Sequence, residues 1–187
     1  MNITVVVYFS IVFFLSETGL AITKHSQKKI VKNRKDKNSL TLFWITIPVS
    51  ITIGFFAAKN QTWSILNIQI AWFGLSLFIA GLVIRWVSIL QLKKEFTVDV
   101  SITKNHKLKT DGIYKHVRHP SYMGLLLTVL GLSIAMNSII SLLVLPIPVF
   151  FAVLYRIKAE ELILINEFGE IYKDYRKKTS KLIPLIY

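Results

Sequence analysis

A short polar run, Arg118-His119-Pro120-Ser121-Tyr122, directly precedes a long apolar stretch. Proline suits the first turn of a helix and disfavours helix at the residue before it, so Pro120 predicts a helix start. The free backbone N–H groups of that turn, with Arg118 and His119 beside them, could bind a carboxylate or a phosphate. A simple membrane-helix entry, with Arg118 reaching lipid headgroups, would explain the same residues.

A second polar cluster, Arg156, Lys158, Glu160 and Glu161, follows the end of the same apolar stretch. Adjacent carboxylates near a membrane are costly unless they are solvated, paired or bound. Glu160 could accept hydrogen bonds from a ligand diol, and Arg156 could hold a substrate anion with its two-pronged guanidinium. The alternative is the first turn of a helix, where the dipole and the neighbouring cations favour both glutamates.

Several other chemistries are excluded or disfavoured. The chain has no cysteine, which removes disulfides, thiolate nucleophiles and cysteine-ligated metals. His116 and His119 could in principle share a metal, but Pro120 prevents helical spacing between them, and we expect no metal. No glycine-rich dinucleotide motif, Walker motif or nucleophile elbow is present, so neither a soluble nucleotide fold nor an acyl-transfer elbow is predicted.

The elements that must position these clusters are predicted to be membrane helices. Of the 187 residues, 53% are hydrophobic and 18% are charged, and the mean hydropathy is +0.53. A bilayer crossing needs roughly 20 apolar residues. Four apolar stretches qualify, the first of which continues past Glu17 to Thr23 and is expected to remain as an anchor: 1–16, 40–58, 60–84 and 121–155.

The last stretch is too long for one crossing, because one helix over 121–155 would reach about 52 Å. Asn137-Ser138 near its middle predicts a turn between two helices. Residues 158–178 place Glu161, Phe168 and Tyr172 on one side of a helix. The predicted fold is an all-α integral membrane protein with about five transmembrane helices, the last two a tight hairpin, plus a cytoplasmic C-terminal amphipathic helix.

The basic residues predict the orientation. Of the 23 lysines and arginines, 21 fall in alternate segments, over 24–38, 91–119 and the C-terminal tail. The positive-inside rule therefore puts the N-terminus outside and these three segments in the cytosol. The net charge of +13 then indicates contact with membrane lipids and no nucleic acid. Arg85 is expected to extend towards the cytosolic interface, with lining of a polar cavity as the alternative, and Glu17 has no predicted partner.

An ordered set of motifs in the second half of the chain resembles one known family. The set is His106-Lys107-Leu108-Lys109, Gly112-Ile113-Tyr114, the Arg118 to Tyr122 run with Gly124, Glu160-Glu161, Phe168-Gly169 with Tyr172 and Tyr175, and Ile183-Pro184. This pattern is similar to the isoprenylcysteine carboxyl methyltransferase family, whose wider group includes phospholipid N-methyltransferases. We expect a single integral membrane domain, 1–187, in which residues 1–91 form three transmembrane helices and residues 92–187 form the catalytic half.

The resemblance implies an enzyme that uses S-adenosylmethionine (SAM) in a cytosol-facing pocket, without a Rossmann fold. Arg156 would bind and orient the substrate, and Tyr122 or Tyr114 would line the methyl path. Lys109 departs from the apolar residue usual in the family, so a contact there would come from its backbone. The implied cofactor contacts are His106, Lys107, Leu108, Lys109, Tyr114, His119, Pro120, Ser121, Tyr122 and Glu160, with Asp99 as a further candidate.

The implied reaction is methyl transfer to the carboxylate of an isoprenylcysteine or a similar lipid-like substrate that enters from the bilayer. A carboxylate is ionised at pH 7 and needs no general base, whereas an amine must lose a proton. A phospholipid or amine N-methyltransferase would therefore use Glu161 or His119 as its base. Two further alternatives are an NADPH-dependent membrane reductase of similar architecture and a scaffold protein with no catalytic activity.

Overall fold

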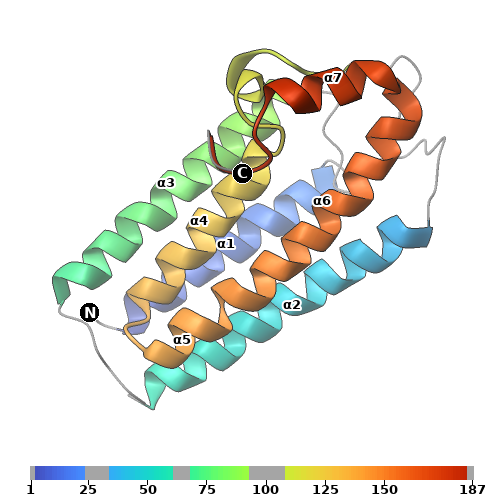
Figure 1. Ribbon diagram of the computed structural model, residues 1–187. Coiled ribbons are helices and arrows are strands. Elements are labelled where there is room, and N and C mark those ends of the chain that lie inside the picture. Colours follow the sequence, from blue (N-terminus) through green and yellow to red (C-terminus); the bar gives the residue numbers. More distant parts are fainter. Residues whose placement is uncertain (1–2, 24–33, 61–67, 93–107, 185–187) are drawn as a thin grey trace.

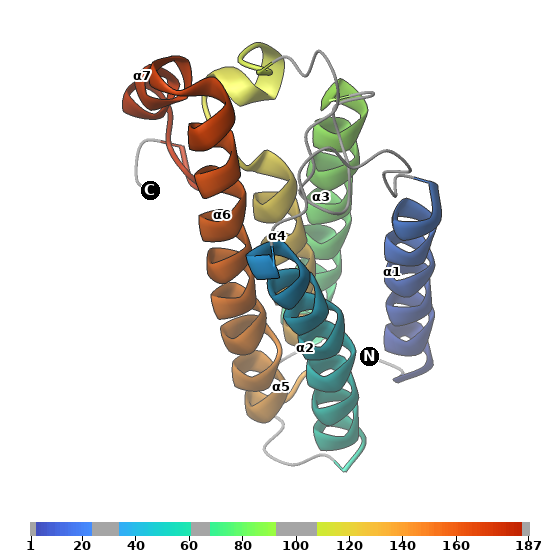
Figure 2. The same ribbon diagram turned by 90° about the vertical axis from the view of Figure 1, so that its right-hand side faces the viewer.

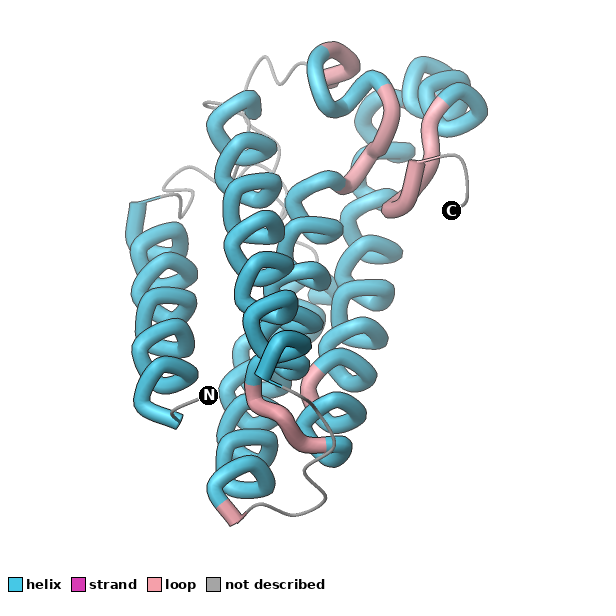
Figure 3. Tube along the Cα trace, turned by 90° about the vertical axis from the view of Figure 1, so that its left-hand side faces the viewer, coloured by secondary structure: helices cyan, strands magenta, loops and turns pink. Residues whose placement is uncertain are grey.

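The computed structural model describes residues 3–23, 34–60, 68–92 and 108–184, and these ranges are nearly all helical. Figure 1 shows the long helices running alongside one another in a tilted bundle, and Figure 3 shows helices joined by loops. The all-α prediction is confirmed. The elements are α1 (Ile3–Thr23), α2 (Arg34–Lys59), α3 (Ile68–Leu92), the 3-10 helix η2 (Gly112–Lys115), α4 (Pro120–Ala135), α5 (Ile139–Val144), α6 (Pro146–Phe168) and α7 (Glu170–Lys178).

Three helical segments are long and apolar enough to cross a membrane, namely Asn38–Lys59, Gln69–Leu92 and Ile139–Phe168. Two shorter apolar helices, Thr4–Leu20 and Pro120–Ala135, accompany them. The predicted hairpin turn is confirmed, because α4 ends at Ala135 and α5 begins at Ile139. At the turn, Asn137 has a positive φ of 55°, a conformation that asparagine tolerates better than most residues.

Two helices differ from the sequence prediction. Helix α3 covers Ile68–Leu92, so it extends past Arg85 and beyond the end of the apolar stretch over 60–84. The single amphipathic helix predicted over 158–178 is wrong, because α6 continues to Phe168 and Gly169 then breaks the helix with a φ of 53°. Glycine adopts such angles without steric cost, which lets α7 turn across one end of the bundle (Figure 1).

Helices α3 and α4 pack backbone to backbone through two pairs of glycines. Gly74 and Gly81 are seven residues apart on α3, as are Gly124 and Gly131 on α4, so each pair lies on one helix face. A Cβ atom on Gly124 would lie 2.7 Å from the carbonyl oxygen of Gly81. Because small residues permit close approach, they are common at helix contacts in membranes. This contact fixes the axial register of α3 against α4.

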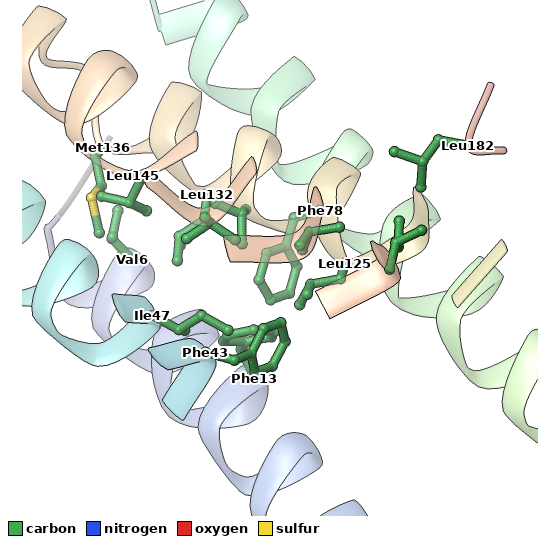
Figure 4. Packing of buried hydrophobic residues seen from close by; sticks show 14 residues of the cluster. Val6, Phe13, Phe43, Ile47, Phe78, Leu125, Leu132, Met136, Leu145 and Leu182 are labelled. Carbon is green, nitrogen blue, oxygen red and sulfur yellow. The ribbon is translucent and has the colours of Figure 1, made fainter. Parts of the chain in front are cut away.

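Helix α1 lies at the edge of the bundle in both Figure 2 and Figure 3. Its buried apolar residues recur every seven positions, at Val6, Phe13 and Leu20, and so form one stripe. Figure 4 shows Phe13 together with Phe43 of α2, close to Phe78 of α3. The buried apolar cluster thus includes side chains from α1, α2 and α3, and it extends to α4 and α6.

The glycine contact predicts a sharp difference between two Gly→Ala variants. Gly124→Ala places a methyl group 2.5 Å from the backbone nitrogen of Arg85, so α3 and α4 must move apart. We expect the free energy of unfolding to fall by about 1–3 kcal/mol. Thermal unfolding in detergent, followed by tryptophan fluorescence, measures the change.

Gly19→Ala is the matched control, because a Cβ on Gly19 of α1 meets nothing within 4 Å. This variant should unfold at the temperature of the unmodified protein or slightly above it. Equal stability of the Gly124→Ala and Gly19→Ala variants would contradict close packing of α3 on α4.

Candidate functional site

The polar run before α4 forms the predicted helix start. His119 occupies the N-cap position, and its carbonyl oxygen accepts hydrogen bonds from the backbone N–H groups of Tyr122 and Met123 at 3.1 and 3.2 Å. The start of α4 lies level with Arg85 and not with the end of α3. Arg85 Nη1 donates to the Ser121 carbonyl at 3.1 Å, whereas α3 continues to Leu92. Seven further residues correspond to about 10 Å. The helix start is therefore recessed beside the last turns of α3.

The segment after α7 holds this polar run in place, a contact that the sequence analysis did not anticipate. Val117 and Ser180 form an isolated parallel bridge. The backbone N–H groups of Arg118 and His119 donate to the carbonyls of Ser180 and Lys181 at 2.9 and 3.2 Å. Residues from the chain's end thus position the entry to α4. The only sequence signal for this contact is Ile183-Pro184, which follows Lys181 closely and belongs to the set of motifs described above.

The two adjacent glutamates of α6 have different partners. Glu160 Oε2 accepts a hydrogen bond from the Tyr122 hydroxyl at 2.9 Å, and 28% of the Glu160 side chain is exposed. Glu161 is buried and accepts from Arg118 Nε at 3.1 Å, with His119 Nε2 at 3.4 Å from the same carboxylate oxygen. Glu161 is therefore held in a charged network, whereas Glu160 remains partly accessible.

Arg118 extends the network around Glu161 to the end of α7. Its Nη1 donates to the carbonyl oxygens of Arg176, at 3.0 Å, and of Thr179. The Arg176 guanidinium lies 3.9 Å from Glu161 Oε2. Arg118 therefore joins the start of α4 to α6 and to the end of α7, and it does not extend to lipid headgroups as the simple entry-helix interpretation expects.

Arg156 lies one helical turn before Glu160 on α6 and is buried, with 3% of its surface exposed. Its Nη1 donates to Ser39 Oγ on α2 at 2.9 Å, and its guanidinium also interacts with the Tyr122 hydroxyl. The predicted site residues Arg156, Tyr122 and Glu160 are thus brought together. Ser39 was not predicted, although it directly precedes the apolar stretch over 40–58.

Three tyrosines connect η2 and α7 to this site. The Tyr114 hydroxyl donates to the Ser88 carbonyl at 3.2 Å, and the Tyr114 carbonyl accepts from the Tyr175 hydroxyl at 2.6 Å. Burial raises the pKa of Tyr114, and it raises the pKa of Tyr175 to about 12, so both hydroxyls keep their protons. The Tyr172 ring packs against Tyr175, with ring centroids 6.0 Å apart.

Tyr172 is the unusual member of this group. It is buried, and within the described residues its hydroxyl has no hydrogen-bond partner. Burial and the charge of Glu161 raise its pKa, so the hydroxyl stays a donor. An unsatisfied buried hydroxyl costs about 1–3 kcal/mol. A polar ligand near the two glutamates would remove that cost.

Arg85 and Glu17 form a buried ion pair that corrects the sequence prediction for both residues. Arg85 Nε and Nη2 each lie 2.6 Å from a different oxygen of the Glu17 carboxylate, and both side chains are less than 10% exposed. Arg85 therefore does not extend towards the interface. It links α1 to α3 and, through the Ser121 carbonyl, to the start of α4. The available sequence signal was the pair of opposite charges, Glu17 within the first apolar stretch and Arg85 directly after the third.

The structure describes only some of the remaining predicted cofactor residues. Leu108 is half-buried, and the Lys109 Nζ lies 2.8 Å from Asp111, away from the glutamates' network. Any contact from Lys109 to the site would therefore come from its backbone. Asp99, His106 and Lys107 lie outside the described residues. Within the described ranges, no three His, Asp or Glu side chains gather as a metal site.

Comparison with known proteins places this fold and site in a class of membrane enzymes. The isoprenylcysteine carboxyl methyltransferase (ICMT) family model matches residues 74–166, from within α3 to near the end of α6. A protein-S-isoprenylcysteine O-methyltransferase B of Arabidopsis thaliana is 30% identical, over 96% of this chain and 91% of the relative. The enzyme of Schizosaccharomyces pombe is 37% identical over 57% of this chain and 46% of its own length.

A solved structure agrees with the sequence matches. The eukaryotic intramembrane Ras methyltransferase ICMT superposes with a TM-score of 0.55 and 26% sequence identity, covering 84% of this chain and 55% of that one. The chain belongs to the isoprenylcysteine carboxyl methyltransferase family. With three helices able to span a bilayer, it is an integral membrane protein.

The Arg85–Glu17 pair predicts strong coupling between two substitutions. Arg85→Met alone leaves a buried carboxylate without its cation and should destabilise the protein by about 3–5 kcal/mol. Adding Glu17→Gln should restore part of that loss, because it removes the uncompensated charge. Thermal unfolding of both single variants and the double variant measures the coupling energy.

The control for this cycle is Ser16→Ala, which removes the hydroxyl that accepts a hydrogen bond from Trp86 Nε1 at 2.9 Å on the same two helices. That bond is exposed and uncharged, so the Ser16→Ala variant should lose little stability. Strictly additive effects of Arg85→Met and Glu17→Gln would contradict the ion pair.

Proposed function

We propose that this chain uses SAM to methylate the carboxylate of an isoprenylcysteine or a similar lipid-like substrate. The supporting observation is that Tyr122, Glu160 and Arg156 meet beside the recessed start of α4. They do so in a chain whose relatives carry the name protein-S-isoprenylcysteine O-methyltransferase. Glu160, the proposed hydrogen-bond acceptor for SAM, thus lies close to Arg156, the proposed cation for the carboxylate of the substrate.

The residues present fit SAM, which carries a carboxylate, an ammonium group, a ribose diol and a sulfonium. Glu160 is partly exposed and could exchange its Tyr122 hydrogen bond for the diol hydroxyls. The backbone N–H groups of Arg118, His119, Tyr122 and Met123 at the α4 start already donate to carbonyl oxygens, which corrects the prediction of free N–H groups there. The Tyr172 hydroxyl, which has no partner among the described residues, is an available donor for the polar end of SAM. His106 and Lys107, outside the described residues, and Leu108, Lys109 and Tyr114 complete the proposed set.

When bound, SAM supplies a methyl group on a cationic sulfur, and this chain's residues orient the acceptor towards it. Arg156 is buried, so its attraction for an incoming carboxylate is little screened by water. Tyr122 contacts both Glu160 and Arg156 and so borders both proposed ligands. Fixing two reactants in this way can supply several kcal/mol of the barrier reduction.

The network around Glu161 supports a carboxylate acceptor over an amine. An amine must lose its proton before attack, and Glu161 and His119 are the predicted bases. Glu161 is engaged by Arg118, and His119 contacts the same carboxylate. Glu161 is thus held in a charged network and is not a free base. His119 also lies near Glu160, with its Nδ1 4.0 Å from Glu160 Oε1, but an ionised carboxylate acceptor needs neither residue as a base.

The proposed setting is a membrane protein whose chain crosses the bilayer five times, with its site at the cytosolic face. The apolar helices α1 and α4 supply the two shorter crossings, and α4 is flanked by α3 and α6. The distribution of lysines and arginines supports this orientation. The proposed partners are membrane lipids and a prenylated substrate that enters from the bilayer, with no nucleic acid.

The test separates cofactor binding from acceptor binding. Glu160→Gln should weaken SAM binding at least tenfold by calorimetry on detergent-purified protein, because a neutral amide replaces the carboxylate that accepts from the diol. Arg156→Lys should leave SAM affinity within about twofold and raise the KM for a prenylcysteine analogue, since lysine lacks the two-pronged geometry.

The assay follows transfer of a labelled methyl group to a prenylcysteine analogue and, in parallel, to an amine-headgroup phospholipid. Glu167→Gln is the control for Glu160→Gln, because Glu167 is exposed two turns further along α6. Absence of SAM binding in several lipids would overturn the proposal. Labelling of the amine lipid alone would overturn the carboxylate acceptor and leave the cofactor site standing.

A further inference from the structure

A second polar cavity lies outside the proposed methyl-transfer site. It is partly open, has a volume of about 400 Å³ and is bordered by η2, the end of α7 and the segment that follows α7. In Figure 1 these elements gather at one end of the bundle. The cavity is lined by Lys115, His116, Lys177, Lys178, Thr179 and Ser180. None of the site's glutamates takes part in the lining.

The charges on this cavity favour an anion. Three lysines and a histidine contribute to its wall, and no carboxylate does. One acidic neighbour, Asp174, lies 2.9 Å from the Lys177 Nζ and offsets part of the charge. Three lysines against one carboxylate leave an excess of positive charge, which attracts anions from solution or from a membrane surface.

Backbone hydrogen bonds hold the two sides of the cavity together. Ser180 N donates to the His116 carbonyl at 3.1 Å, so the backbone after η2 is joined directly to the segment after α7. Thr179 Oγ1 donates to the Tyr175 carbonyl at 2.7 Å, which fixes the corner after α7. The lysines that line the cavity are therefore carried by backbone segments that hydrogen bonds hold together.

The position of the cavity suits the level of lipid headgroups. The candidate span Ile139–Phe168 ends one residue before the break at Gly169, and α7 begins directly after it. Two large apolar side chains, Ile171 and Ile183, are exposed on α7 and beside the lining residue Pro184. Basic and exposed apolar residues together are typical of surfaces that contact the bilayer interface.

We propose that this cavity binds a phosphate group, supplied in the membrane by the headgroup of an anionic phospholipid. Lysine ammonium groups are common phosphate ligands, and the cavity brings three of them together. This inference is independent of the methyltransferase reaction, because the cavity shares none of the proposed SAM or acceptor residues.

The test measures binding of short-chain, water-soluble phospholipids to the purified full chain by native mass spectrometry. Dihexanoyl phosphatidic acid should bind more tightly than dihexanoyl phosphatidylcholine, and added salt should weaken the binding. Lys115→Gln and Lys177→Gln, on opposite walls, should each weaken phosphatidic acid binding about fivefold, since a lysine near an anionic surface contributes roughly that factor.

Lys173→Gln is the matched control. Lys173 is exposed on the same helix and forms the same kind of pair three residues apart, with its Nζ 2.6 Å from Glu170, but it does not line the cavity. Its substitution should leave phosphatidic acid affinity within about twofold, because most single exposed ion pairs contribute little.

Inorganic phosphate, tested in the same way, identifies the source of the anion. Binding of phosphatidic acid without inorganic phosphate supports a lipid headgroup. Binding of inorganic phosphate that Lys177→Gln weakens supports the phosphate site and assigns it to a soluble anion. Equal binding of phosphatidic acid and phosphatidylcholine would overturn the proposal, as would equal weakening by Lys173→Gln and Lys177→Gln.

Discussion

The close contact between α3 and α4 is the constraint on which the rest of the structure depends. Its glycines allow one register, in which Gly124 faces Gly81 and the Ser121 carbonyl faces Arg85. That register sets the start of α4 below the end of α3 and so creates the recess beside Tyr122. Moving the helices apart by the width of a methyl group would disturb both the Arg85–Ser121 hydrogen bond and the recess.

Two adjacent glutamates of α6 do different work because a helix turns by about 100° per residue. Glu161 faces the α7 side, where Arg118 and Arg176 hold it. Glu160 faces Tyr122 and keeps part of its surface accessible. Glu161 thus belongs to a structural network, whereas the adjacent Glu160 can accept hydrogen bonds from a ligand. The positions of Arg118 and Thr179 explain why the end of the chain matters to a site on α4.

Local sequence features predicted much of this fold, whereas contacts between residues far apart in the sequence could not be predicted. Pro120 predicts the start of α4, and Asn137-Ser138 predicts the hairpin turn, because each acts on its own backbone. The partner of Arg85 is set by how α1 packs, which no local pattern reveals. The break at Gly169 was missed because the apolar spacing continues across it. For the site, the motifs indicated which residues matter, and the structure supplied their partners.

The ion pair between Glu17 and Arg85 has a consequence for how the chain enters the membrane. The two residues are 68 positions apart. At a synthesis rate of roughly 5–20 residues per second, Glu17 is synthesised roughly 3–14 s before Arg85. During that interval the carboxylate in α1 lacks the Arg85 guanidinium that pairs with it in the folded protein, so α1 stays near the membrane interface. Helix α1 is therefore synthesised before α3 but reaches its final position only once α3 is present.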